Sequence, residues 1–159
     1  NPEAQLVLVG RDASDIATGS SSTWQLMQKL FTPEALMQVS YLGGVPYEEV
    51  RSHIAQATVC VFPTFAEALP VSWLEAMAME KAIVASNIGW APEVISTNKE
   101  GVLVHPKDHE TYANSIIELL QNETKNRFLG HNAAKKVKMV FDNYIIAEKS
   151  LKFYRKFVK

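Results

Sequence analysis

Short apolar runs alternate with helical segments over the first two thirds of the chain, and this alternation restricts the folds open to it. Runs bounded by turn residues occur at 6–9, 39–42, 58–62, 82–85 and 101–104. Each run is typical of a β-strand. Helices or helix starts are predicted between them at 23–31, 46–55 and 70–79, with a short turn at 92–95. Strands that are apolar on both faces and alternate with helices indicate a parallel sheet covered by helices.

The last third of the chain is predicted to be helical only. Helices are expected over 111–120, 124–140 and 143–158, the last one after the capping residue Asp142. The prediction is therefore an α/β fold, a Rossmann-like parallel sheet flanked by helices, with C-terminal helices. A chain of 159 residues that is 47% hydrophobic suits one domain over 1–159. Because the chain lacks an initial methionine and enters a strand almost at once, we expect it to be excised from a longer protein.

Composition excludes several classes of function. Sixteen Lys and Arg against seventeen Asp and Glu give a net charge of -1, which argues against nucleic acid as a partner. The single cysteine, Cys60, lies in an apolar run and is predicted to be buried, so no disulfide framework is expected. No run reaches the roughly 18 apolar residues of a membrane span, and residues 1–4 lack the pattern of a secretion signal, so secretion is not expected. We expect a cytoplasmic protein.

The candidate site follows the third predicted strand, because ligands of open α/β sheets bind beyond the carboxyl ends of the strands. A helix is predicted to start at Pro70, and the unpaired N–H groups of Val71 and Ser72 in its first turn suit a diphosphate. Glu75, one turn further, could accept hydrogen bonds from a ribose, and Glu67 from a sugar beyond the phosphates. The alternative is that both carboxylates are ordinary solvated charges.

The segment 63–86, PTFAEALPVSWLEAMAMEKAIVAS, resembles the E-x7-E signature of family 4 glycosyltransferases, with Glu67 and Glu75 at the required spacing. Segments 41–45, 89–93 and 101–106 resemble further parts of that family in the same order. The resemblance implies one half of a GT-B fold, in which two Rossmann-like domains face a cleft. This chain resembles the second half, the domain that binds the donor, a nucleoside diphosphate sugar.

The resemblance also implies residue roles. Glu67 is the candidate catalytic residue and would bind hydroxyls of the transferred sugar. The donor-binding residues would be Val45 and Tyr47 at the base, Leu69 and Pro70 beside the sugar, Val71 and Ser72 at the phosphate, and Glu75 at the ribose. The implied reaction is retaining transfer of a hexose or related sugar to a hydroxyl of a glycan, lipid-linked or similar acceptor. The acceptor would be bound by a missing N-terminal domain, and the isolated chain is expected to be inactive.

No metal and no cofactor are expected. The resemblance implies metal-independent chemistry, and the chain contains no Asp-x-Asp motif. His105 and His109 have a metal-like spacing but are predicted to be surface residues. In the family, an Arg and a Lys that neutralise the diphosphate precede the part that begins here. Arg11 is the nearest basic candidate and is predicted to be a solvated loop residue.

The sequence departs from the family pattern at one short segment and two single positions. Residues 68–70, Glu80 and Trp90 stand where glycine is common, and Pro70 removes a backbone donor. The identity of the sugar therefore does not transfer from the resemblance. Trp73 and Trp90 are predicted to be packing residues rather than sugar platforms. Two alternatives to a transferase remain open, a sugar-nucleotide epimerase of the same architecture and a non-catalytic binding module.

The last predicted helix is amphipathic. Its apolar face is predicted to pack against a domain, and the second option is a peripheral contact with the cytoplasmic membrane face. The basic stripe comprises Lys149, Lys152, Lys156 and Lys159, and the apolar face comprises Ile146, Phe153, Tyr154, Phe157 and Val158.

Overall fold

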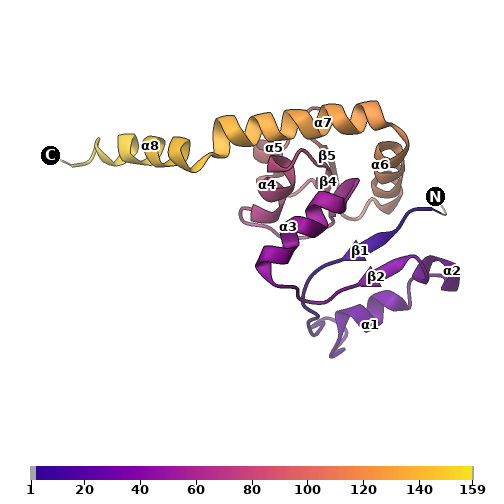
Figure 1. The fold of residues 1–159 in the computed structure, drawn as a ribbon. Helices are drawn as coiled ribbons and strands as arrows, with labels where there is room; N and C mark the ends of the chain where they lie inside the picture. Colours follow the sequence, from indigo (N-terminus) through magenta and orange to yellow (C-terminus); the bar gives the residue numbers. More distant parts are fainter. Residues whose placement is uncertain (1–2, 159) are drawn as a thin grey trace. The chain divides into compact units, whose positions relative to one another are not determined.

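The computed structural model describes residues 3–158, and the chain divides into two compact units, Asn1–Ser52 and His53–Lys159. Every named strand of the described residues pairs in parallel, and helices flank the sheets (Figure 1). The predicted α/β class with parallel pairing is therefore confirmed. The single domain over 1–159 stays a prediction.

The first unit contains one parallel strand pair, β1 (Leu6–Leu8) and β2 (Val39–Tyr41). Between them lie two helices, α1 (Thr23–Gln28) and α2 (Pro33–Leu36). The short helix α2 was not predicted, although it has a proline at its first position and a Thr32 side chain that caps the Ala35 N–H. Helix α3 (Tyr47–Gln56) begins in the first unit and ends in the second.

The second unit is built on three parallel strands in the order β3-β4-β5. They are β3 (Val59–Phe62), β4 (Ala82–Ser86) and β5 (Val102–Val104). The central strand β4 is buried along its whole length, as the apolar character of this run predicts for a strand covered on both faces. Helices α4 (Val71–Ala78) and α5 (Ala91–Val94) lie in the connections between these strands.

Two apolar clusters lie on the opposite faces of this sheet. Ile83 and Ala85 of β4 face the cluster that includes Trp73 and Met77 of α4, whereas Ala82 and Val84 face the other cluster. The second cluster takes Tyr112 and Leu119 from α6 (His109–Gln121) and Leu129 from α7 (Glu123–Lys136). Cys60 lies in the first cluster, and its predicted burial is confirmed.

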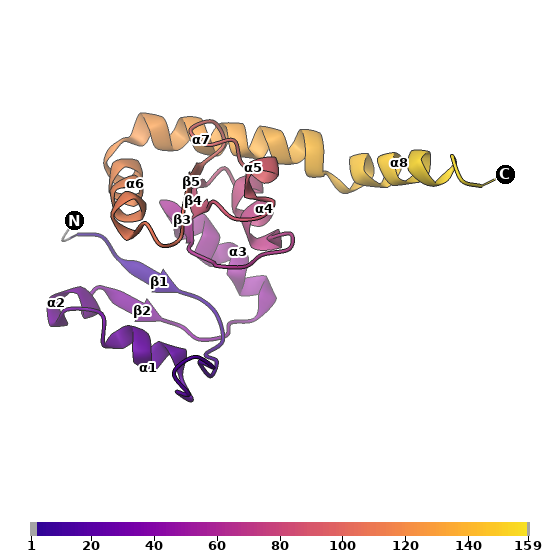
Figure 2. The same cartoon turned by 180° about the vertical axis from the view of Figure 1, so that it is seen from behind.

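The long helix predicted over 124–140 is interrupted. Helix α7 passes at Lys136 into a π-helical segment, η1 (Val137–Phe141), and the chain becomes extended at Asp142 before α8 (Asn143–Tyr154) begins. The predicted cap is confirmed, because the Asp142 carboxylate accepts a hydrogen bond from the Tyr144 N–H at 2.9 Å. Figures 1 and 2 show α8 projecting away from the other elements of the second unit.

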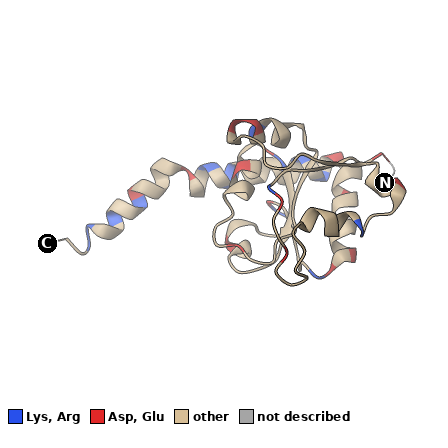
Figure 3. Ribbon diagram, turned by 90° about the horizontal axis from the view of Figure 1, so that it is seen from below, with Lys and Arg blue, Asp and Glu red and all other residues tan. Residues whose placement is uncertain are grey.

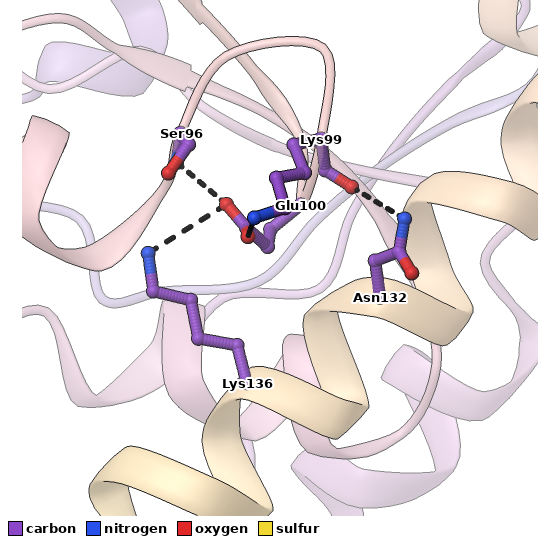
Figure 4. A network of polar contacts seen from close by, with 5 residues as sticks. All are labelled: Ser96, Lys99, Glu100, Asn132 and Lys136. Carbon is purple, nitrogen blue, oxygen red and sulfur yellow. Dashed lines mark hydrogen bonds and ion pairs between the residues drawn. The ribbon is translucent and has the colours of Figure 1, made fainter.

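A buried carboxylate joins α7 to the turn that precedes β5 (Figure 4). Glu100 is 5% exposed and accepts a hydrogen bond from the Ser96 N–H at 2.7 Å. Its carboxylate lies 3.6 Å from Lys136 Nζ and 3.8 Å from Lys99 Nζ. Asn132 of α7 donates to the Lys99 carbonyl at 3.1 Å. Since a buried carboxylate must be paired, this network fixes α7 against the turn.

Helix α7 also passes very close to the turn between α4 and β4. A Cβ atom added at Gly130 would lie 2.1 Å from the Glu80 carbonyl oxygen and 2.8 Å from the Glu80 carbonyl carbon. Glu80 itself has a left-handed backbone, with φ of 58°. Glycine is therefore required at position 130, because no other residue leaves room for this approach.

Candidate functional site

The candidate site begins where β3 ends. The chain continues from Phe62 through a loop, residues 63–69, into α4, and Pro70 is the N-cap rather than the first helical residue. This shift by one residue leaves the predicted geometry of the first turn intact. Among the described residues, no partner is found for the N–H groups of Val71 and Ser72, whereas the next two, at Trp73 and Leu74, donate to the Pro70 carbonyl. Two amides at a helix N-terminus are thus available to an anion.

The rotation of α4 is fixed by its buried side. Trp73, Ala76 and Met77 are buried, and Trp73 packs against Phe62 with a ring centroid distance of 6.1 Å. Val71, in the first turn of the same helix, is 59% exposed. Burial follows Trp73 instead, since a bulky indole gains the most by leaving water.

In the chain, the two glutamates of the E-x7-E pattern flank the residues that carry the available amides. Glu67 is half-buried in the loop before α4, and Glu75 is half-buried on the helix. At 1.5 Å per residue, Glu75 lies about 5 Å along the helix axis from the first-turn amides. Leu69 is exposed to solvent, whereas the Pro70 side chain is buried and holds the end of the loop against the protein.

Two further features belong to the loop that carries Glu67. Gly89, in the loop after β4, has φ of 46°, and a Cβ atom added to it would lie 3.9 Å from the Glu67 carbonyl oxygen. A side chain at position 89 would therefore meet the backbone of the Glu67 loop. The buried hydroxyl of Thr64 has no hydrogen-bond partner among residues 3–158. A buried polar atom of this kind is a candidate ligand contact that the sequence did not indicate.

The predicted contacts to the base lie in the first unit. Val45 is half-buried after β2, and Tyr47 is 75% exposed at the start of α3. Arg11 is exposed, as predicted, and its side chain lies against Gly44, where an added Cβ would be 2.7 Å from Arg11 Cγ. The other six predicted site residues all lie in one short segment of the second unit, residues 67–75. That Val45 and Tyr47 contact the same ligand stays a prediction.

The loop after β1 is ordered by one carboxylate. Asp12 accepts hydrogen bonds from the Ser22 hydroxyl and from the backbone N–H groups of Ala13 and Trp24. These contacts, led by the one from Ser22, lower the pKa of Asp12. A pocket of about 260 Å³ lies next to this loop at the carboxyl end of β1, with Trp24 and Tyr41 in its wall at a ring centroid distance of 4.8 Å.

Trp90 is not the packing residue that was predicted. Its side chain is 58% exposed, whereas Trp73 is 1% exposed and confirms the same prediction. Trp90 lies directly after Gly89, at the N-cap of α5.

His105 and His109 are both exposed, which confirms their assignment to the surface. Within residues 3–158, no three His, Cys, Asp or Glu side chains come together as a metal site would require. No helix in the same range has both the length and the apolar character to cross a bilayer.

Comparisons with known proteins identify the family of the chain. The family model for glycosyl transferases group 1 matches residues 1–136. Alpha-maltose-1-phosphate synthase of Mycolicibacterium smegmatis is 33% identical over 163 residues, which cover 98% of this chain and 41% of that protein. An alpha-1,3-N-acetylgalactosaminyltransferase of Campylobacter jejuni, which acts on N,N'-diacetylbacillosaminyl-diphospho-undecaprenol, is 35% identical over 121 residues, 74% of this chain and 32% of that protein. The chain thus spans less than half the length of these relatives.

Solved structures show the same fold. Sucrose-phosphate synthase from Thermosynechococcus elongatus matches with a TM-score of 0.80 and 28% identity, over 96% of this chain and 38% of that one. HepE of Anabaena, in complex with UDP, matches with a TM-score of 0.84 and 22% identity, over 98% of this chain and 42% of that one. Both are GT-B proteins, so the predicted fold, one half of GT-B, is confirmed.

Proposed function

Since the chain belongs to the glycosyl transferases of group 1, we propose that it binds a nucleoside diphosphate sugar as the donor of a retaining glycosyltransferase. One observation carries this proposal. Between β3 and Glu75, the chain carries Glu67 in the loop and then the two available amides of Val71 and Ser72 in the first turn of α4. A diphosphate is an anion that suits the amides, and a sugar on each side of it offers hydroxyl groups to the carboxylates.

Each group then has one role. The N–H groups of Val71 and Ser72 donate to a phosphate, and Glu75 accepts hydrogen bonds from the ribose hydroxyls one turn along α4. Glu67 accepts hydrogen bonds from the transferred sugar, with the backbone of Leu69 and Pro70 beside it. The base lies against Val45 and Tyr47 of the first unit. HepE of Anabaena, which shares the fold, has been solved with UDP-glucose, and this supports a nucleotide sugar as the ligand.

The proposed reaction is departure of the nucleoside diphosphate and attack by an acceptor hydroxyl on the same face of the sugar. Donors that are already in place stabilise the charge that develops on the diphosphate. Glu67 orients the sugar and does not act as a nucleophile. Neither a metal nor a cofactor is part of the proposal, because amides and cationic side chains carry the diphosphate.

The complete reaction is proposed for a longer protein, since the chain covers 41% of its mycobacterial relative. A further domain would bind the acceptor, a glycan or a lipid-linked sugar, and would supply the cations of the diphosphate site. The relative from Campylobacter jejuni acts on a diphospho-undecaprenol acceptor, which supports a lipid-linked one. We expect the 159-residue chain alone to bind donor without transferring it, and a cytoplasmic location for the whole.

Calorimetric titration of the chain with UDP, UDP-glucose, GDP and GDP-mannose tests the proposal. Hydrogen bonds to a charged group contribute about 1.5–3 kcal/mol, or roughly 10- to 150-fold in affinity. Glu75→Gln should therefore weaken nucleotide and nucleotide sugar alike, whereas Glu67→Gln should weaken only the nucleotide sugar. Glu110→Gln, an exposed carboxylate in the first turn of α6, is the matched control. Unchanged affinity in both site variants would show that the site lies elsewhere.

The same nucleotide sugars distinguish a transferase from the two alternative functions. An epimerase would convert the nucleotide sugar without any acceptor. A binding module would hold the donor and leave it intact even in the full-length protein, and the departures from the family pattern at residues 68–70 and Trp90 favour this alternative over the epimerase. Incubating the full-length protein with donor, with and without a lipid-linked acceptor, and analysing the sugar by chromatography distinguishes the three.

Helix α8 is the second surface with a proposed partner. It is amphipathic, with exposed apolar side chains that include Phe153 and Tyr154 and basic side chains along its length (Figure 3). Lys159, the last member of the predicted basic stripe, lies outside the described residues. We propose either packing on the rest of a longer chain or a peripheral contact with an anionic membrane. If the chain sediments with phosphatidylserine liposomes in a salt-sensitive way, and Lys149→Glu/Lys152→Glu abolishes this, α8 contacts the membrane. If the chain does not sediment with them even at low salt, α8 packs on the rest of a longer chain.

A further inference from the structure

The exposed indole of Trp90 has no structural role that explains it. The residue has φ of -80° and ψ of 0°, a backbone conformation open to ordinary residues, so neither glycine nor tryptophan is required there. Among the described residues, its ring makes no aromatic contact and its indole N–H has no hydrogen-bond partner. An indole that is 58% exposed forgoes much of the free energy that burial would contribute.

The position of Trp90 connects it to the candidate site. It ends the loop after β4, and β4 pairs with β3 so that Ala85 lies opposite Phe62. The loops that follow these two strands therefore start side by side at the carboxyl edge of the sheet. A Cβ atom added to Gly89, the residue before Trp90, would lie 3.9 Å from the Glu67 carbonyl oxygen. The indole is thus carried by the loop that neighbours the loop of Glu67.

An indole and a carboxylate on adjoining loops have complementary chemistry for one kind of ligand. A pyranose ring offers C–H groups on its face and hydroxyl groups at its edge. Aromatic rings pack against apolar faces, and carboxylates accept hydrogen bonds from hydroxyls. Binding sites for small molecules commonly combine an aromatic wall with a few polar groups that fix orientation. A sugar ring can use both side chains at once.

We propose that Trp90 is a specificity residue for the transferred sugar, whose C–H face packs on the indole while Glu67 holds its hydroxyls. This inference rests on the proposed function, because it assumes that Glu67 faces the sugar of the donor. The site then favours an uncharged pyranose with an apolar face. A sugar acid is disfavoured, because its carboxylate lies near that of Glu67.

The test compares nucleotide sugar with nucleotide, because only the former contains the pyranose. Calorimetry with UDP-glucose and UDP, and in parallel with GDP-mannose and GDP, is done on the chain and on Trp90→Ala and Trp90→Phe. Trp90→Ala should weaken the nucleotide sugar about tenfold, as expected for one lost aromatic contact, and change the affinity for the nucleotide less than twofold. Trp90→Phe should retain most of the affinity. Phe128→Ala, which removes a 56% exposed ring from α7, is the matched control and should change neither.

The outcomes separate this inference from the proposed function. If Glu67→Gln weakens the nucleotide sugar and Trp90→Ala does not, the role of Trp90 is refuted and the donor site stands. If Trp90→Ala weakens nucleotide and nucleotide sugar equally, the indole contacts the nucleotide and the inference is again refuted. If the unmodified chain binds none of the four compounds, the proposed function fails and the inference fails with it.

Discussion

Replacing Gly130 with alanine tests the tightest contact of the second unit. The added Cβ would lie 2.1 Å from the Glu80 carbonyl oxygen, whereas ordinary contacts begin at 3.4 Å. The two backbones would have to separate by 1.3 Å, the difference between these distances. No side-chain rotation can relieve this overlap, because both partners are backbone. The neighbours of Gly130 in α7, Leu129 and Ala133, are fully buried and would have to move with the helix.

Two opposing effects set the magnitude. Alanine is favoured over glycine inside a helix by about 1 kcal/mol. Overpacking of a core costs about 1–3 kcal/mol, and the upper end applies here because the contact is rigid and moving α7 opens gaps around Leu129 and Ala133. The net expectation is a loss of about 2 kcal/mol in the free energy of unfolding. For a chain of this size that loss lowers Tm by about 4–8 °C.

The assay is urea unfolding followed by circular dichroism, with His131→Ala, an exposed position on the same helix, as the control. His131→Ala should change the unfolding free energy by less than about 0.5 kcal/mol. The sign of the Gly130→Ala effect decides the question, because helix propensity alone predicts stabilisation. A Gly130→Ala chain as stable as the original, or more stable, would refute the close approach of α7 to the turn.

Three further predictions concern stability. Glu80→Gly should raise the unfolding free energy by about 0.5–1 kcal/mol in the same urea assay, because a left-handed backbone strains residues other than glycine; a loss would refute the strain. Glu100→Gln should cost about 2–4 kcal/mol, since Lys136 loses its buried partner. Adding Lys136→Met should cost less than the sum of the two single changes, and simple additivity would refute the coupling. Burial raises the pKa of Tyr112 to about 12 from 10.0, so its phenol stabilises the fold fully below pH 10 and loses that contribution as the pH rises to 12. The stability difference between the chain and Tyr112→Phe should therefore shrink over that interval in pH-dependent urea unfolding, and a constant difference would contradict the raised pKa.

The strands were predictable to within one or two residues because a strand that is buried on both faces consists almost entirely of apolar residues. Strand β4, for example, is apolar at nearly every position and is buried throughout. Helix ends were less predictable. Helix α6 starts two residues earlier than predicted because Asp108 caps it through the Thr111 N–H. The break at η1 carries no proline or glycine signal, and it lies where α7 leaves the core.

The candidate site also contains residues that the local sequence indicates and contacts that only the fold reveals. Glu67 and Glu75 were found through a local pattern, which survives in the structure because a loop and one helix carry it. The closeness of Gly89 to the Glu67 loop depends on how two strands pair, and no local pattern encodes it. Trp90 was assigned to the core because tryptophan is usually buried, and only the path of the loop shows that it is not. The burial of Glu100 was equally hidden, since its partner Lys136 comes from a distant helix.

Pro70 lies between two parts of the candidate site, the loop 63–69 and helix α4, that differ in how well they tolerate substitution. After it, the buried face of α4 is packed against the sheet, so substitutions at Trp73 or Met77 would disturb the core. Before it, the loop is mostly exposed and packs little of its side-chain surface. A substitution in residues 63–69 should therefore cost less stability than one on the buried face of α4, so the loop can change its shape while the helix stays in place.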